Sequence, residues 1–157
     1  MSTGSYRIVV EKLGRIARPV DEVRRQFGDM RHHEANRVHR AIKIKCLSDD
    51  GTTCRYVSEL SLLGMTQRDE TIMVRNPDGS LTNDIVAGTN AGTRITQTFR
   101  PDGDEATQIV FRLDALANGL KRLLKPFLAT AIRYQLDRAF EEDRFDLEQL
   151  GYPRKTA

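Results

Sequence analysis

The alternation of short apolar runs with turn sequences constrains this chain more than any other feature. From about residue 40 onward, stretches in which apolar and polar residues alternate are separated repeatedly by turns rich in Gly and Asp, and one long amphipathic segment follows. Strict alternation is typical of half-buried antiparallel strands, and apolar residues spaced three and four apart are typical of a helix that buries one face. We therefore predict an α+β fold, in which a curved antiparallel sheet of about six to seven strands wraps around a long C-terminal helix.

The segment before the alternating runs predicts one strand and two short helices. Residues 6–17 alternate as a strand that ends at Arg18-Pro19, because proline breaks a sheet ladder. Pro19 also suits a first helical turn, so a short helix is expected after it, ending at Gly28. Asp29 is expected to be the N-cap of a second short helix through about residue 36.

The turns also predict which strand residues face the inside of the curved sheet, because directly opposed residues of an antiparallel pair share a face. A three-residue turn at residues 49–51 places Cys46 opposite Cys54, and a later turn places Asn83 opposite Gln97. The predicted inward residues are Ile42, Ile44, Cys46, Cys54, Tyr56, Ser58, Leu60, Leu62, Ile72, Val74, Leu81, Asn83, Ile85, Ala87, Thr93, Ile95, Gln97, Phe99, Ile109, Phe111, Leu113 and Ala115.

The last segment, residues 119–150, is long enough as a helix to cross the whole sheet. Pro126 near its start predicts a kink or a separate short helix there. Gln135 projects from the centre of the apolar side, and the small side chains of Ala131 and Ala139 beside it leave space. The residues predicted on that side are Leu120, Leu124, Phe127, Leu128, Ala131, Ala139 and Leu147.

Composition narrows the class of protein. The 157 residues fit one domain, residues 1–157, with a single core, and we expect a cytoplasmic protein because the first five residues do not resemble a secretory signal and no apolar stretch is long enough to span a membrane. Cys46 and Cys54 are too few for a disulfide framework and are expected to be reduced thiols. Residues 1–45 carry eleven Lys or Arg against five Asp or Glu, but aromatic residues make up only 6% of the chain, so we expect no nucleic-acid partner.

Two stretches resemble a known superfamily. Ala17-Arg18-Pro19-Val20-Asp21-Glu22-Val23 resembles the start of the first helix in START-like proteins, also called the SRPBCC or birch-pollen-allergen-like superfamily. The segment 96–150 adds Phe99-Arg100-Pro101-Asp102-Gly103 and Gly119-Leu120-x-x-Leu123-Leu124-x-Pro126, with the polyketide cyclase/dehydrase and lipid-transport branch the most similar. This resemblance implies a helix-grip fold with an apolar cavity between sheet and helix, and it implies no fixed catalytic residues.

We expect a small apolar molecule in that cavity, held by a few polar groups. A buried polar group without a partner is costly, so each inward polar residue should bond a neighbour, a water or a ligand. Two interpretations of Asn83 and Gln97 are open: their side-chain amides satisfy each other's hydrogen bonds, or they orient a ligand. The residues predicted to contact the ligand are Tyr56, Ser58, Asn83, Gln97, Phe111, Leu124, Phe127, Ala131, Gln135 and His39.

The three histidines, His32, His33 and His39, lie close together in the sequence, at the expected cavity mouth. Adjacent histidines on a helix point about 100° apart, so at most one of His32 and His33 can join His39 at a metal. No motif such as His-Glu-x-x-His supplies a carboxylate, so we predict no metal and no cofactor. A general acid or base role for His33 or His39 and an ordinary surface or capping role are the alternatives.

Three functions fit these observations. The favoured one is a non-enzymatic binding or carrier protein, monomeric or homodimeric, for a lipid, polyketide-like or aromatic metabolite. An enzyme of the cyclase or dehydratase type requires a titratable group inside the cavity. The only titratable groups predicted there are Tyr56 and the two cysteine thiols, so no catalytic residue is assigned. A protein-interaction module requires a closed core, so the volume of the cavity distinguishes it from the other two.

Overall fold

The computed structural model describes residues 6–62, 64–117 and 120–155, apart from the side chains of residues 62, 120 and 122. The expectations for the first five residues, for Gly119 and for the side chains of Leu62 and Leu120 lie outside the described residues. Seven antiparallel strands form one sheet in the order β1-β7-β6-β5-β4-β3-β2. They are β1 (Arg7–Ile16), β2 (Ile42–Asp49), β3 (Thr53–Leu62), β4 (Met65–Arg75), β5 (Leu81–Gly88), β6 (Arg94–Pro101) and β7 (Thr107–Leu116).

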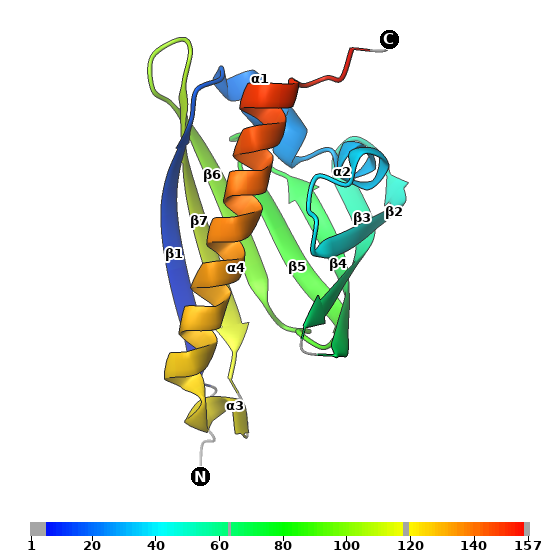
Figure 1. Ribbon diagram of the computed structural model, residues 1–157, viewed down its shortest axis with the longest axis vertical. Coiled ribbons are helices and arrows are strands. Elements are labelled where there is room, and N and C mark those ends of the chain that lie inside the picture. Colours follow the sequence, from blue (N-terminus) through cyan, green and yellow to red (C-terminus); the bar gives the residue numbers. More distant parts are fainter. Residues whose placement is uncertain (1–5, 63, 118–119, 156–157) are drawn as a thin grey trace.

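The long helix α4 (Lys125–Phe145) lies along one face of this sheet, as Figure 1 shows. It follows the short helix α3 (Leu120–Leu123) and continues into a π-helical turn, η1 (Asp146–Leu150). Pro126 stands in the first turn of α4 and separates it from α3. The predicted helix-grip architecture and the break at Pro126 are thus confirmed. Within the described ranges, no helix is both long enough and apolar enough to cross a membrane.

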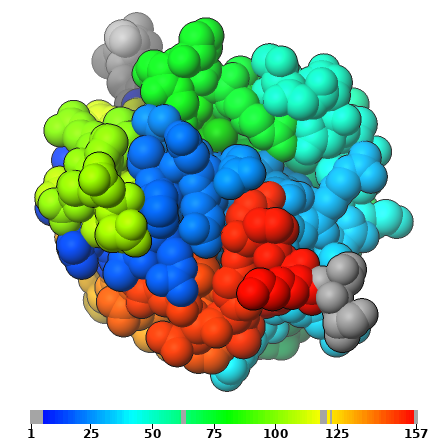
Figure 2. Space-filling view, turned by 90° about the horizontal axis from the view of Figure 1, so that it is seen from above, coloured from blue at the N-terminus to red at the C-terminus, as the bar shows by residue number. Residues whose placement is uncertain are grey.

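Helices α1 (Val20–Phe27) and α2 (Met30–Asn36) follow β1 as predicted. Pro19 precedes α1, Gly28 ends it, and the Asp29 side chain accepts a hydrogen bond from the His32 backbone N–H at 2.9 Å. Figure 2, the view from above, shows α1 packed between the β6–β7 hairpin and the C-terminal segment. The buried face of α1 packs on the sheet through Phe27, whose ring centroid lies 5.5 Å from that of Phe99 and 5.9 Å from that of Phe111. The helices therefore close one end of the molecule over an aromatic core.

Two predicted pairings are wrong by two residues. A β-bulge after Cys46 places it opposite Tyr56, and Asp49 opposite Cys54. Asn83 likewise pairs with Ile95 rather than with Gln97. A shift of two residues leaves every side chain on its predicted face. The two cysteines are free thiols, with their sulfur atoms 3.8 Å apart.

The predicted face of β4 is wrong. Leu62 pairs with Met65, so the β3–β4 connection is shorter than expected, and this one-residue slip turns the other face inward. Thr71 and Met73 are buried in place of Ile72 and Val74. A second bulge, where Glu70 pairs with Ala87 but Thr71 pairs with Ile85, leaves Ala87 exposed. The practical result is that one carboxylate, Asp69, faces inward.

Candidate functional site

A cavity of about 480 Å³ lies between the sheet and α4. Most of its wall is aliphatic or aromatic, and its polar groups include a row on the sheet, the carboxylate of Asp69 and a cluster of histidine and aspartate side chains. Lining residues come from all seven strands, from helices α1 to α4 and from the β5–β6 loop. The apolar ones include Ile8, Phe27, Met30, Ile42, Ile44, Leu60, Ile85, Ile95, Leu113, Leu128, Ile132, Leu136 and Ala139.

Eight of the ten residues predicted to contact a ligand line this cavity, and two do not. Leu124 and Phe127 are 42% and 76% exposed and stand outside the lining. The break at Pro126 sets the phase of α4, so that Leu128 rather than Phe127 turns toward the sheet. The eight that line the cavity are Tyr56, Ser58, Asn83, Gln97, Phe111, Ala131, Gln135 and His39.

A row of three polar side chains crosses the sheet wall. The Tyr56 hydroxyl donates to the side-chain carbonyl of Asn83 at 3.2 Å, and the Asn83 amide lies 3.4 Å from Oε1 of Gln97. Burial raises the pKa of Tyr56 to about 12, so its hydroxyl keeps its proton at neutral pH. Asn83 and Gln97 thus meet as diagonal rather than direct neighbours. Among the described residues, the Gln97 amide nitrogen has no hydrogen-bond partner, which leaves a donor at the cavity wall.

The carboxylate of Asp69 is the second polar group, and the sequence did not predict it. Asp69 accepts from the backbone N–H of Asn90 at 2.8 Å and from the Asn90 side-chain amide at 2.7 Å. These bonds fasten the β5–β6 loop to β4. Each carboxylate oxygen of Asp69 therefore accepts one bond from Asn90, and Asp69 holds this loop at the cavity wall.

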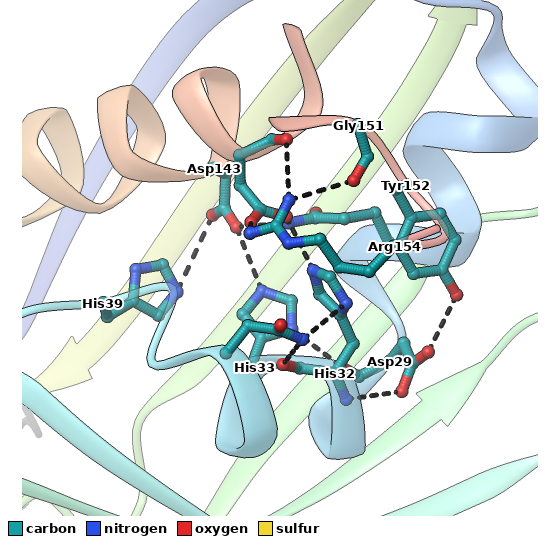
Figure 3. Close-up of polar contacts among 11 residues, drawn as sticks. Asp29, His32, His33, His39, Asp143, Gly151, Tyr152 and Arg154 are labelled. Atoms are coloured by element: carbon teal, nitrogen blue, oxygen red, sulfur yellow. Dashed lines mark hydrogen bonds and ion pairs between the residues drawn. The ribbon is translucent and has the colours of Figure 1, made fainter. Parts of the chain in front are cut away.

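The third polar region, at the inner end of the cavity, joins two histidines to Asp143 of α4 (Figure 3). Nε2 of His33 lies 3.0 Å from Oδ1 of Asp143, and Nε2 of His39 lies 3.8 Å from Oδ2 of the same carboxylate. His33 and Asp143 are 4% and 5% exposed. All three residues line the cavity. The carboxylate that no short sequence motif provides thus comes from Asp143, more than a hundred residues after the histidines.

The other ring nitrogens of these histidines also face acceptors. Nδ1 of His33 donates to the backbone carbonyl of Asp29 at 2.7 Å, and Nδ1 of His39 lies 3.2 Å from Oε2 of Glu142. Burial opposes charge on His39, but the carboxylates of Asp143 and Glu142 outweigh it and raise the pKa of His39. Burial likewise opposes charge on Asp143, but His39 and His33 outweigh it and lower its pKa. The cluster is therefore strongly polar in an otherwise apolar cavity.

His32 belongs to a separate, adjoining network. Its Nε2 lies 2.6 Å from Oδ2 of Asp146, and its Nδ1 faces the side-chain amide of Asn36 at 3.1 Å. Arg154 donates to the other oxygen of Asp146, and the Gln26 amide lies 3.1 Å from both Asp143 and Asp146. His32 is not part of the cavity lining. Its contacts fasten α2 to the C-terminal segment.

Solved structures resemble this chain, although no family model and no curated protein matches its sequence. A START superfamily protein from Mycobacterium smegmatis superposes with a TM-score of 0.74 at 13% identity, over 91% of this chain and 99% of that one. The Zhui aromatase/cyclase from Streptomyces sp. R1128 gives 0.74 at 14% identity, over 93% and 99%. Truncated norcoclaurine synthase from Thalictrum flavum gives 0.73 at 11% identity, over 95% and 98%. The chain has the START-like fold.

In this START-like fold, the exposed residues of the lining show where the cavity opens. Thr89, Ala91, Lys121 and Ala131 are exposed, whereas His32 and His33 are buried. Ala131 and Asp143 are twelve residues apart on α4, which corresponds to about 18 Å along the helix axis. The side chains of His32 and His33 thus do not form the rim of the cavity, contrary to the predicted position of its mouth.

One sequence signal would have located the acidic member of the cluster. Asp143 follows Gln135 and Ala139 at successive four-residue steps, so the face predicted to look into the START-like cavity continues to it. Asp69 had no such signal, because its direction depends on the length of the β3–β4 turn.

Proposed function

We propose that the protein binds a small, largely apolar molecule that carries one or more polar groups, as a carrier or binding protein. The observation that carries this proposal is the cavity of about 480 Å³, with its apolar walls and the Tyr56, Asn83 and Gln97 row. Small-molecule sites generally have such volumes, mostly apolar walls and a few convergent polar groups. Burial of the apolar part of the ligand would supply most of the affinity, and the row would orient it.

Proteins of the same fold support the chemical class of the ligand. A structure of norcoclaurine synthase from Thalictrum flavum is in complex with dopamine and hydroxybenzaldehyde, and Zhui is an aromatase/cyclase. A lipid, polyketide-like or aromatic metabolite is accordingly proposed for this chain. A protein-interaction module is disfavoured, because its core would be filled by its own side chains and would not leave a cavity of this size.

Native mass spectrometry of the protein purified from its expression host tests the proposal, followed by denaturing extraction of any bound molecule. We expect one apolar passenger per chain in the wild type. Ala131→Phe should exclude it by obstructing the open part of the cavity, whereas Thr130→Phe, which adds the same ring at the neighbouring position outside the lining, should retain it. A protein that is empty, and that also binds nothing from a panel of lipids and polyketides, would contradict the proposal.

One observation favours a second function, catalysis of a cyclisation or dehydration. His39 and Asp143 place titratable groups on the cavity wall, which such proton transfers require. The test incubates the extracted passenger with wild type and with His39→Gln and follows both its mass and its chromatographic retention, because a cyclisation that loses no water leaves the mass unchanged. Loss of water, or a new isomer of the same mass, in the wild-type sample alone would support catalysis. An unchanged passenger in both would leave binding as the whole function.

A further inference from the structure

We propose that His33, His39 and Asp143 form a binding site for one divalent transition-metal ion, of which Zn²⁺ is the test case, at the inner end of the cavity. The inference goes beyond ligand binding and does not depend on which molecule the cavity holds. It starts from the donor set, since two imidazoles and one carboxylate are common zinc ligands.

The three donors are close enough to share an ion after a small adjustment. One ligand atom from each residue lies within 4.8 Å of the others. Ligands about 2.0 to 2.2 Å from a tetrahedral zinc are roughly 3.3 to 3.6 Å from one another, so the widest pair must approach by a little over 1 Å. His39 lies outside regular structure, between α2 and β2, where side-chain rotation and a small backbone shift supply such a movement.

The outer contacts of both histidines present the correct nitrogen. A backbone carbonyl can only accept a hydrogen bond. The contact between Nδ1 of His33 and the Asp29 carbonyl therefore requires a proton on Nδ1. The Glu142 carboxylate does the same for Nδ1 of His39. In the neutral rings, the lone pair is then on Nε2, and both Nε2 atoms face Asp143. Metal-binding histidines almost always have such an acceptor on the second nitrogen, because it fixes the tautomer and the ring orientation.

The adjoining histidine shows that this arrangement is not a general feature of the network. His32 donates from Nε2 to Asp146 and faces an amide donor at Nδ1, so one neutral tautomer satisfies the whole ring. His33 and His39 instead present four nitrogens to acceptors only. Without a metal, these contacts are fully satisfied only by two charged imidazolium rings, next to two carboxylates, Asp143 and Glu142. A divalent ion satisfies them with both rings neutral.

The site also has an open side. Its three protein ligands all line the cavity, and zinc sites with three protein ligands leave the fourth position to water or substrate. A metal ion here would therefore face the bound molecule and coordinate an oxygen at its polar end.

The experiment uses chelator-treated protein without a cavity ligand, titrated with Zn²⁺ by calorimetry and with Co²⁺ by visible absorption. We expect one ion per chain and a Co²⁺ spectrum of a low-coordinate site. His39→Ala should weaken Zn²⁺ binding by more than about 100-fold. Glu142→Gln, which removes the charge of the outer acceptor and its ion pair with Arg138, should weaken it by about 10- to 100-fold. His32→Gln is the matched control, a buried histidine paired with an aspartate outside the cluster, and should bind as the wild type does.

Two results would overturn the site. The first is no saturable binding of Zn²⁺ or Co²⁺ by the wild type at micromolar protein concentration. The second is equal binding by wild type and a folded His39→Ala variant, which would assign the ion to an adventitious surface position. His39→Ala is preferred to His33→Ala because His33 also joins α2 to α4, and circular dichroism checks that each variant is folded.

Discussion

Asp69 and Asn90 are joined by two hydrogen bonds, one from the backbone N–H of Asn90 and one from its side-chain amide, each to a different carboxylate oxygen. Asp69 is 7% exposed, so both bonds are made where water competes poorly. The pair holds the β5–β6 loop against β4 at the open part of the cavity.

Removing this carboxylate should loosen the loop. Asp69→Ala is expected to lower the free energy of unfolding by about 1 to 3 kcal/mol, because it leaves the donors of Asn90 without their acceptor. Asn90→Ala removes the side-chain bond to Asp69 and a longer one to Gln67 but keeps the backbone bond, and should cost less. Denaturant unfolding measures both, and hydrogen exchange at the backbone N–H of residue 90 should accelerate in the first variant. Equal losses in the two variants would contradict this account.

Gly14 lies directly beneath the ring of Phe140. A Cβ atom at Gly14 would overlap that ring, so Gly14→Ala is expected to destabilise the protein by about 1 to 3 kcal/mol through overpacking. Phe140→Leu on the Gly14→Ala background should recover part of the loss. A double-mutant cycle from thermal unfolding measures the coupling. Additive effects of the two changes would show that the overlap is relieved elsewhere.

Asp49 and Arg75 provide a test by pH. Two Arg75 nitrogens donate to the two Asp49 oxygens at 2.8 and 2.7 Å, and these bonds lower the pKa of Asp49 from its ordinary value of 3.8. A lowered pKa means that the stabilisation is complete above pH 4 and is lost as the pH falls through the folded-state value. Asp49→Asn should cost about 1 kcal/mol at pH 7, and progressively less below pH 4.

Urea unfolding at several pH values checks this expectation. Glu11→Gln, which breaks an exposed ion pair with Arg112, serves as the control and should show little effect throughout. A difference between wild type and Asp49→Asn that is as large at pH 3 as at pH 7 would exclude the ion pair as its source.

The row of Tyr56, Asn83 and Gln97 should favour ligands with a polar group over purely apolar ligands. Gln97→Leu is expected to weaken binding of ligands that bear a carbonyl or hydroxyl group by up to about tenfold, since one hydrogen bond contributes about 0.5 to 1.5 kcal/mol. Purely apolar ligands of the same size should bind as before. Fluorescence displacement with matched pairs of ligands measures the contrast. Equal losses for both kinds would indicate a change in cavity shape instead.

The order and type of the elements could be predicted because the signals for them are local. Pro19, Gly28 and Asp29 mark helix ends through their own backbone or side-chain chemistry, and they act as predicted. The predicted faces of β3, β6 and β7 are also correct, as is that of β5 up to the bulge before Ala87. Alternation along one strand determines which residues share a face, and no neighbouring strand is needed to see it.

Pairing between strands could not be predicted to the same precision. Bulges at Leu47 and Val86 arise from how two strands fit, and neither leaves a distinctive residue in the sequence. The same limit applies to the inner end of the cavity. His33 and Asp143 meet because the fold brings α2 near the C-terminal part of α4, and neither segment shows this on its own.

The wall of the cavity takes residues from nearly the whole chain, from Ile8 on β1 to Asp143 near the end of α4. A molecule bound there touches segments that separate on unfolding, so its binding free energy adds to the stability of the entire protein. A ligand at 100 times its Kd contributes about 2.7 kcal/mol, which in a chain of this length raises Tm by roughly 5 to 10 °C. The melting temperature is therefore an assay in itself. A library of compounds can be screened against this protein without a label and without knowing its natural ligand.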